Sequence, residues 1–228
     1  MSQTVVGGQG APAERLALGG RTASQGMFGG IALVLGIVGL AVANSYPGAE
    51  VYLNAVAQIS LGLSLIVFGM ALAMAYIRVI SDTEPHNGGG TVMGTTADMF
   101  LGGAVVIMGV LALVHIVPQI LIPAAAIVVG VGLLLNSAAS VRAATLETEV
   151  AGGRTLGRRA HEELVFATAS VRAVAGVAVA VLGILGLTTS ANAMLLTLAA
   201  AIVAGAAMLL ASTSLSGRFV RTVVPHTA

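Results

Sequence analysis

Few residues in this chain have the type and spacing that catalysis or metal binding requires. His161, Glu162 and Glu163 are adjacent, but no second histidine follows at the spacing of a zinc-protease motif, so a solvated helix face is the preferred interpretation. The glycines that follow His86 lack the lysine and the serine or threonine of a phosphate-binding loop. There is no cysteine, which excludes disulfides and thiolate ligands. We therefore expect no catalytic residue, no metal site, no cofactor and no enzymatic activity.

Three amide side chains inside apolar stretches are the candidates for polar contacts. Asn54 and Gln58 are one helical turn apart and share a helix face, and Asn136 lies in a later stretch. In membrane helices such residues mostly form interhelical hydrogen bonds, and a substrate contact is the alternative. His115 is interpreted as an interfacial residue, because no partner ligands are evident. Asp98 is expected to cap the start of a helix, where a carboxylate meets the positive end of the dipole.

The composition of the chain is that of an integral membrane protein. Charged residues make up 8% of the 228 residues, against about 25% in a soluble domain, and apolar residues make up 57%. The net charge of +1, without a basic face, argues against a nucleic-acid partner. We predict an all-α integral membrane protein with six transmembrane helices. The expected spans are about 27–43, 52–77, 99–117, 120–141, 173–188 and 194–214.

Glycines recur with the same spacing in three parts of the sequence. The six predicted spans form three consecutive pairs. In each pair the first span carries two glycines seven residues apart, and the second span carries a glycine three residues after an isoleucine. A period this long predicts a repeated helical hairpin. Small residues on one face let helix backbones approach closely in lipid. The expected helix-packing residues are Gly29, Gly36, Gly62, Gly102, Gly109, Gly130, Gly176, Gly183 and Gly205.

The arginines predict the topology. All ten lie before the first span, after the second, between the fourth and fifth, or after the sixth. The positive-inside rule places that side, and both chain ends, in the cytoplasm. Each hairpin has two spans, so the three are parallel repeats related by an axis along the membrane normal. The sequence leaves open whether they close around this axis or lie in a row.

The predicted organisation has three parts. A flexible cytoplasmic segment 1–25 precedes a six-helix membrane domain 26–217, and a cytoplasmic tail 218–228 follows. The repeats of the membrane domain cover about 26–80, 99–142 and 172–217, with an amphipathic cytoplasmic segment at about 155–171 that turns into the fifth span.

The repeated unit resembles a known family. The run GGAVVIMGVLALVHIVPQILIPAAAIVVGVGLLLNSAAS, with its glycine and leucine spacing and its turn proline, resembles the HdeD-like membrane proteins, built of short repeats of unknown function. The resemblance covers about 27–217. Pro47 and Pro118 mark the first two turns, whereas the third carries Thr188-Thr189-Ser190-Ala191-Asn192 instead. The resemblance implies a bacterial inner-membrane protein linked to acid stress, and it transfers no catalytic residue.

Three functional hypotheses follow. The first is a non-enzymatic bacterial inner-membrane protein with a structural or stress-response role, including acid resistance, that acts through helix packing and lipid or partner contacts. Its partners are membrane lipids, with a second copy of the chain or a larger membrane complex as further candidates. The second is an accessory subunit that holds lipid, quinone or pigment. The third is a small channel or transporter lined by Asn54, Gln58 and Asn136. No charged residue lies in the middle of a predicted span, which argues against the third.

Overall fold

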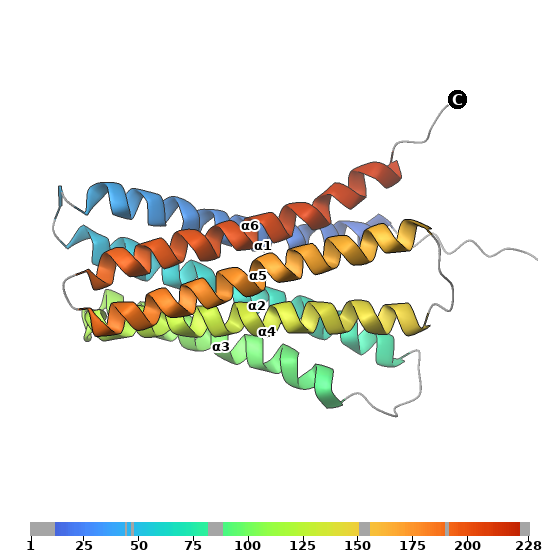
Figure 1. Ribbon diagram of the computed structural model, residues 1–228, viewed down its shortest axis with the longest axis horizontal. Coiled ribbons are helices and arrows are strands. Elements are labelled where there is room, and N and C mark those ends of the chain that lie inside the picture. Colours follow the sequence, from blue (N-terminus) through green and yellow to red (C-terminus); the bar gives the residue numbers. More distant parts are fainter. Residues whose placement is uncertain are drawn as a thin grey trace, which may run out of the picture.

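In the residues that it describes, the computed structural model has six long helices (Figure 1). They are α1 Pro12–Val42, α2 Ala49–Ser81, α3 Gly89–Leu113, α4 Pro118–Val150, α5 Leu156–Thr188 and α6 Ala193–Val223. The structure describes the backbone of residues 12–43, 45–46, 48–81, 89–150, 156–189 and 192–223. It describes side chains within 26–70 except 44 and 47, at 73, and within 97–141, 166–189 and 192–212. All regular structure in these ranges is helical, which confirms the predicted all-α fold.

Most helices extend beyond the predicted spans, because polar sequence continues the helix past the apolar run. The predicted end of the third span at 117 is wrong: α3 ends at Leu113, and residues 114–117 form a turn in which His115 and Val117 have left-handed φ values. α1 begins at Pro12, inside the segment 1–25 that the sequence predicts as flexible. α5 begins at Leu156 and runs without a break through 171 into the apolar stretch, so the predicted turn between an amphipathic helix and the fifth span is wrong. No glycine or proline lies between Arg158 and Ala175 to interrupt this helix. The side chains of 161–163 lie outside the described residues.

The described helices have the length and the surface of membrane spans. Apolar stretches long enough to cross a membrane lie in α2, α4, α5 and α6, and shorter ones lie in α1 and α3. Large apolar side chains point outward, among them Phe100 and Val174, which are 79% and 70% exposed. The described side chains include only three charged ones, Glu50, Asp98 and Arg172. This outer surface therefore suits lipid rather than water.

The three hairpins close into a ring. α1 packs on α2, α3 on α4 and α5 on α6 within the hairpins, and α2 contacts α3 and α4 contacts α5 between them. The contact of α6 with α1 joins the last hairpin to the first, so the hairpins do not lie in a row. Because α2, α4 and α6 also contact one another, they surround the central axis, with α1, α3 and α5 outside them.

Figure 1 shows the two ends of this ring. We call the end with the three turns inside the hairpins, at 43–48, 114–117 and 189–192, the hairpin end. The opposite end, where α1 begins and α6 ends, is the terminal end.

Glycine pairs bring neighbouring hairpins into backbone contact. A Cβ on Gly102 would lie 2.7 Å from the carbonyl oxygen of Gly62, and one on Gly62 would lie 2.8 Å from that of Gly102. Nearer the hairpin end, a Cβ on Gly109 would lie 2.7 Å from the side chain of Ile59. Only glycine permits backbones this close. The equivalent contacts in the other two interfaces join Gly176 to Gly130, Gly183 to Ile127, Gly29 to Gly205 and Gly36 to Ile202.

The contact between Gly62 and Gly102 yields a matched test. Gly102→Ala is expected to lower the melting temperature in detergent by roughly 5 °C, because overpacking costs about 1–3 kcal/mol. Gly103→Ala is the control, since a Cβ there would meet nothing within 4 Å and alanine favours a helix. Equal melting temperatures for the two variants, measured by fluorescence or light scattering, would contradict the importance of this contact.

Candidate functional site

Apolar side chains fill the axis of the bundle. Leu65, Leu133 and Met208 lie three residues after Gly62, Gly130 and Gly205, and they form one layer. Leu61 and Val129, one residue before the first two of these glycines, lie in the next layer. Each of these five side chains is at most 1% exposed. We call Leu61, Leu65, Val129, Leu133 and Met208 the apolar plug, and it separates the polar groups toward the two ends of the ring.

On the hairpin-end side of the plug, Asn54 connects α2 to α6. Its Nδ2 donates to the Thr197 hydroxyl oxygen and, at 3.1 Å, to the Met194 carbonyl oxygen. The Thr197 hydroxyl in turn donates to the Ala193 carbonyl oxygen at 3.0 Å. Asn54 is fully buried, so this hydrogen bond is shielded from water and lipid.

Gln58 shares the face of Asn54 but not its contacts. The side chain is 1% exposed, and neither Oε1 nor Nε2 has a hydrogen-bond partner in the described part of the chain. A buried amide without partners costs free energy, because it gives up its hydrogen bonds to water. Asn54 Oδ1 also has no hydrogen-bond partner among the described residues, but Asn54 Nδ2 has two, so we expect Gln58 to cost the fold more free energy than Asn54 does.

The three predicted amides do not come together. Gln58 lies four residues before Gly62 and Asn136 six residues after Gly130, on opposite sides of the plug. Because the two glycines occupy equivalent crossings, this is a separation of roughly 15 Å along the axis. Asn136 is 2% exposed, and its Oδ1 has no hydrogen-bond partner. The apolar plug therefore lies between Gln58 and Asn136 along the axis.

Two charged side chains inside the helices were missed by the sequence reasoning. Asp98 does not cap a helix, because α3 begins at Gly89, and it is fully buried. Arg172 does not belong to a connecting loop, because it lies within α5 with 6% exposure. The spacing in the sequence could have indicated their burial. Asp98 lies four residues before Gly102 and Arg172 four residues before Gly176, so each shares a helix face with a packing glycine. The prediction that both charges lie outside the apolar helices is wrong.

Both charges lie on the terminal-end side of the plug, each about one helical turn from a crossing glycine. The guanidinium carbon of Arg172 lies 4.9 Å from the centre of the Phe68 ring of α2, a cation–π distance. Both carboxylate oxygens of Asp98, and the hydroxyl of Ser64, have no hydrogen-bond partner among the described residues.

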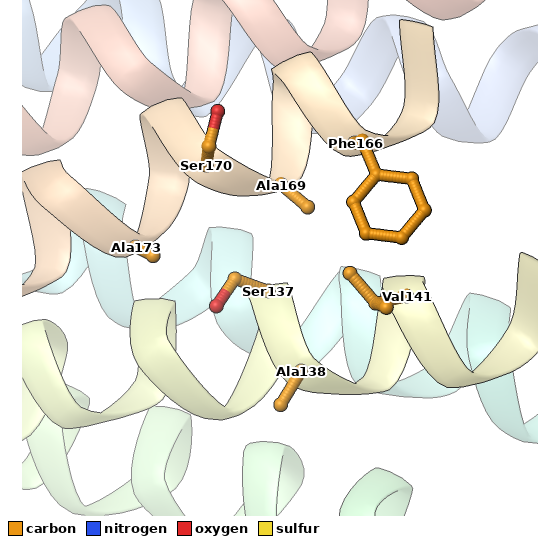
Figure 2. Close-up of a pocket in the computed structure, with 7 residues that line it drawn as sticks. All are labelled: Ser137, Ala138, Val141, Phe166, Ala169, Ser170 and Ala173. Carbon is orange, nitrogen blue, oxygen red and sulfur yellow. The ribbon is translucent and has the colours of Figure 1, made fainter. Parts of the chain in front are cut away.

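A groove of about 400 Å³ lies between α4 and α5, near the level of Arg172 along the bundle (Figure 2). The Phe166 ring faces Val141 across it, and most other lining side chains are alanines. The two hydroxyls at the groove, of Ser137 and Ser170, donate to carbonyl oxygens of their own helices at 2.7 and 2.8 Å. Their remaining lone pairs are weak polar features of an otherwise apolar space. The lining residues are Ser137, Ala138, Val141, Phe166, Ala169, Ser170 and Ala173.

The described side chains contain no group of three or more histidine, cysteine, aspartate or glutamate residues that could hold a metal ion. His115 is exposed at the α3–α4 turn, where its ring packs edge-on against Tyr52 at a centroid distance of 5.2 Å. His115 and Val117 both adopt left-handed φ values, 63° and 43°, just before Pro118 begins α4. The histidine therefore supports a tight turn at the hairpin end.

The fold and these buried groups define the class of the molecule: it is an all-α integral membrane protein. Its three hairpins form a closed ring around an apolar plug. No family model, curated protein or solved structure matches the chain. The class therefore rests on the helices and their packing.

The two amides of α2 give opposite predictions. Asn54→Leu is expected to lower the detergent melting temperature by roughly 2–5 °C, because an interhelical hydrogen bond in a membrane protein contributes about 0.6–1.7 kcal/mol. Gln58→Met keeps the size of the side chain and removes two unpartnered polar atoms, so it is expected to raise the melting temperature. A loss of stability in Gln58→Met would indicate that Gln58 has a polar partner in the membrane.

Proposed function

We propose that the protein is a non-enzymatic bacterial inner-membrane protein of the HdeD-like type, with a structural or stress-response role that includes acid resistance. It acts through helix packing and through contacts with lipids or protein partners on its outer face. The observation that carries this proposal is the apolar plug, because Leu65, Leu133 and Met208 fill the axis that a permanent pore would need. The matched glycine contacts of the three interfaces support the interpretation of the hairpins as internal repeats.

The orientation is part of the same proposal. All ten arginines belong to segments on the terminal-end side, so the terminal end faces the cytoplasm under the positive-inside rule. Glu50 is the only described charged residue toward the hairpin end. Both termini are accordingly cytoplasmic.

The groove between α4 and α5 is the described feature that suits a lipid contact. Its apolar walls and its volume of about 400 Å³ fit an acyl chain. In the sequence, Arg142 directly follows the lining residue Val141, and basic residues attract the anionic lipids of the cytoplasmic leaflet. The occupant we propose is one phospholipid of the cytoplasmic leaflet.

A small channel or transporter is the second candidate function, and one observation favours it. Asp98 and Arg172 are ionisable groups buried inside membrane helices, and such groups often mark ion or proton pathways. In that case the plug would be a hydrophobic gate between the polar groups of the two ends. Flux measurements separate this candidate from the first.

Reconstituted protein is expected to move protons, sodium, potassium and chloride no faster than empty vesicles do, because the plug leaves no polar path along the axis. The measurement uses dye-loaded liposomes with imposed ion gradients, and gramicidin serves as the positive control. Flux above that of empty vesicles that disappears in Asp98→Asn would replace the first candidate by the second.

Filling the groove is expected to displace a bound lipid. Ser170→Phe places a ring in the groove from an exposed lining position, and Val171→Phe is the matched control on the adjacent exposed position outside it. Native mass spectrometry after mild-detergent purification should show about one phospholipid fewer per chain in Ser170→Phe only. The same lipid count in wild type and both variants would contradict this lipid site.

A further inference from the structure

The turn between α3 and α4 exposes apolar side chains at the hairpin end. Val114, Ile116 and Val117 are 65%, 49% and 55% exposed, and Ile120 in the first turn of α4 is 57% exposed. We call these four residues the apolar tip. His115 is the polar member of the turn, and its ring packs against Tyr52.

The other two turns of the hairpin end expose polar side chains. Ser45 and Tyr46 are exposed in the turn between α1 and α2, and Thr189 and Asn192 are exposed in the turn between α5 and α6. The three hairpins share their crossing glycines but not the chemistry of their turns. The apolar tip is therefore a special feature of the middle hairpin.

Hydrogen bonds within the turn satisfy the backbone at the end of α3. The last four carbonyl oxygens of a helix have no partner inside the helix itself. Here the His115 N–H donates to the Ala112 carbonyl oxygen at 3.0 Å. The Ile116 N–H donates to the Leu111 carbonyl oxygen at 3.1 Å. These are the two bonds of a Schellman motif, with His115 as its left-handed residue.

The other two carbonyl oxygens at this helix end also have donors. The Val114 N–H donates to the Val110 carbonyl oxygen at 3.2 Å. In the Nδ1–H tautomer, the His115 ring donates to the Leu113 carbonyl oxygen at 3.1 Å. Backbone groups that face lipid must be satisfied within the protein, because lipid offers no hydrogen bonds. The end of α3 meets this condition.

Val117 departs from the usual chemistry of a turn. Its φ is 43°, in the left-handed region, where glycine and asparagine are favoured and a β-branched residue is strained. The backbone alone would therefore favour a polar residue or glycine here. An exposed valine at such a position indicates that the surroundings of the turn favour an apolar side chain.

We propose that the apolar tip inserts among the acyl chains of the lipid leaflet at the hairpin end, just below the headgroups. Tyr52 is half exposed beside the turn, and tyrosine favours the headgroup level of a membrane. The tip also continues the lipid-facing surface of α3, where Ile107 and Val110 are 61% and 46% exposed. This continuity favours lipid over a protein as its occupant.

The inference goes beyond the proposed function and does not depend on it. The groove between α4 and α5 lies on the terminal-end side of the plug, whereas the apolar tip lies at the hairpin end. A transporter could carry the same tip. Loss of the groove lipid would therefore leave the insertion of the tip unaffected, and the two proposals can fail separately.

Tryptophan fluorescence tests the insertion, on a full-length chain that has no tryptophan of its own. Ile116→Trp and Ser45→Trp form a matched pair, because each position is exposed and lies three residues after the end of its helix. In liposomes, phosphatidylcholine brominated near the headgroup end of its acyl chains should quench Ile116→Trp roughly twofold, whereas acrylamide should quench mainly Ser45→Trp. Val114→Trp is the second position on the tip, used in the same way if Ile116→Trp does not reconstitute.

A further variant separates the tip from the tryptophan itself, since tryptophan alone favours the membrane interface. Adding Val114→Ser and Val117→Asn to Ile116→Trp should reduce its bromolipid quenching to the level of Ser45→Trp, and asparagine suits the left-handed φ at 117. Equal quenching of Ile116→Trp and Ser45→Trp by bromolipid, or by acrylamide, would overturn the proposal. Protection of Ile116→Trp from both quenchers would also overturn it and would indicate contact with a second copy of the chain.

Discussion

The close approach of helix backbones at three glycine pairs is the constraint on which the rest of the structure depends. In lipid there is no hydrophobic drive between helices, so van der Waals contact and polar interactions must hold them together. The pairs Gly62–Gly102, Gly130–Gly176 and Gly29–Gly205 make that contact at backbone distance. Because each hairpin contributes one glycine to the interface before it and one to the interface after it, repetition of the contact closes the ring.

This crossing geometry also decides which polar side chains are buried. A residue four positions before a crossing glycine lies on the face that meets the neighbouring hairpin, so Asp98 and Arg172 enter the bundle although both follow polar sequence. The Phe68 ring lies at a cation–π distance from the Arg172 guanidinium, whereas the Asp98 carboxylate has no hydrogen-bond partner among the described residues. Asn54 has a partner on α6, whereas Gln58, one turn further along the same face, has none.

The proposed function depends on where the plug, the buried charges and the outer surface lie in the bundle. The plug separates the polar groups of the two ends, which favours a protein that works through its surface. The groove between α4 and α5 interrupts that surface close to the buried Asn136 and Arg172, since Ser137 and Ala173 directly follow them in the chain. The proposed lipid site therefore lies near buried polar groups of α4 and α5.

The sequence by itself determined the all-α membrane class, the six helices and the glycines that lie at the crossings, because apolar length and small-residue spacing are local properties. It also located the three hairpin turns and the apolar character of the outer face. Only the tertiary structure decided that α6 returns to α1, that Asn54 and Gln58 differ, and that Asp98 and Arg172 are buried inside the bundle. These facts depend on contacts between residues far apart in the chain, and helix spacing alone does not say which neighbour a buried face will meet.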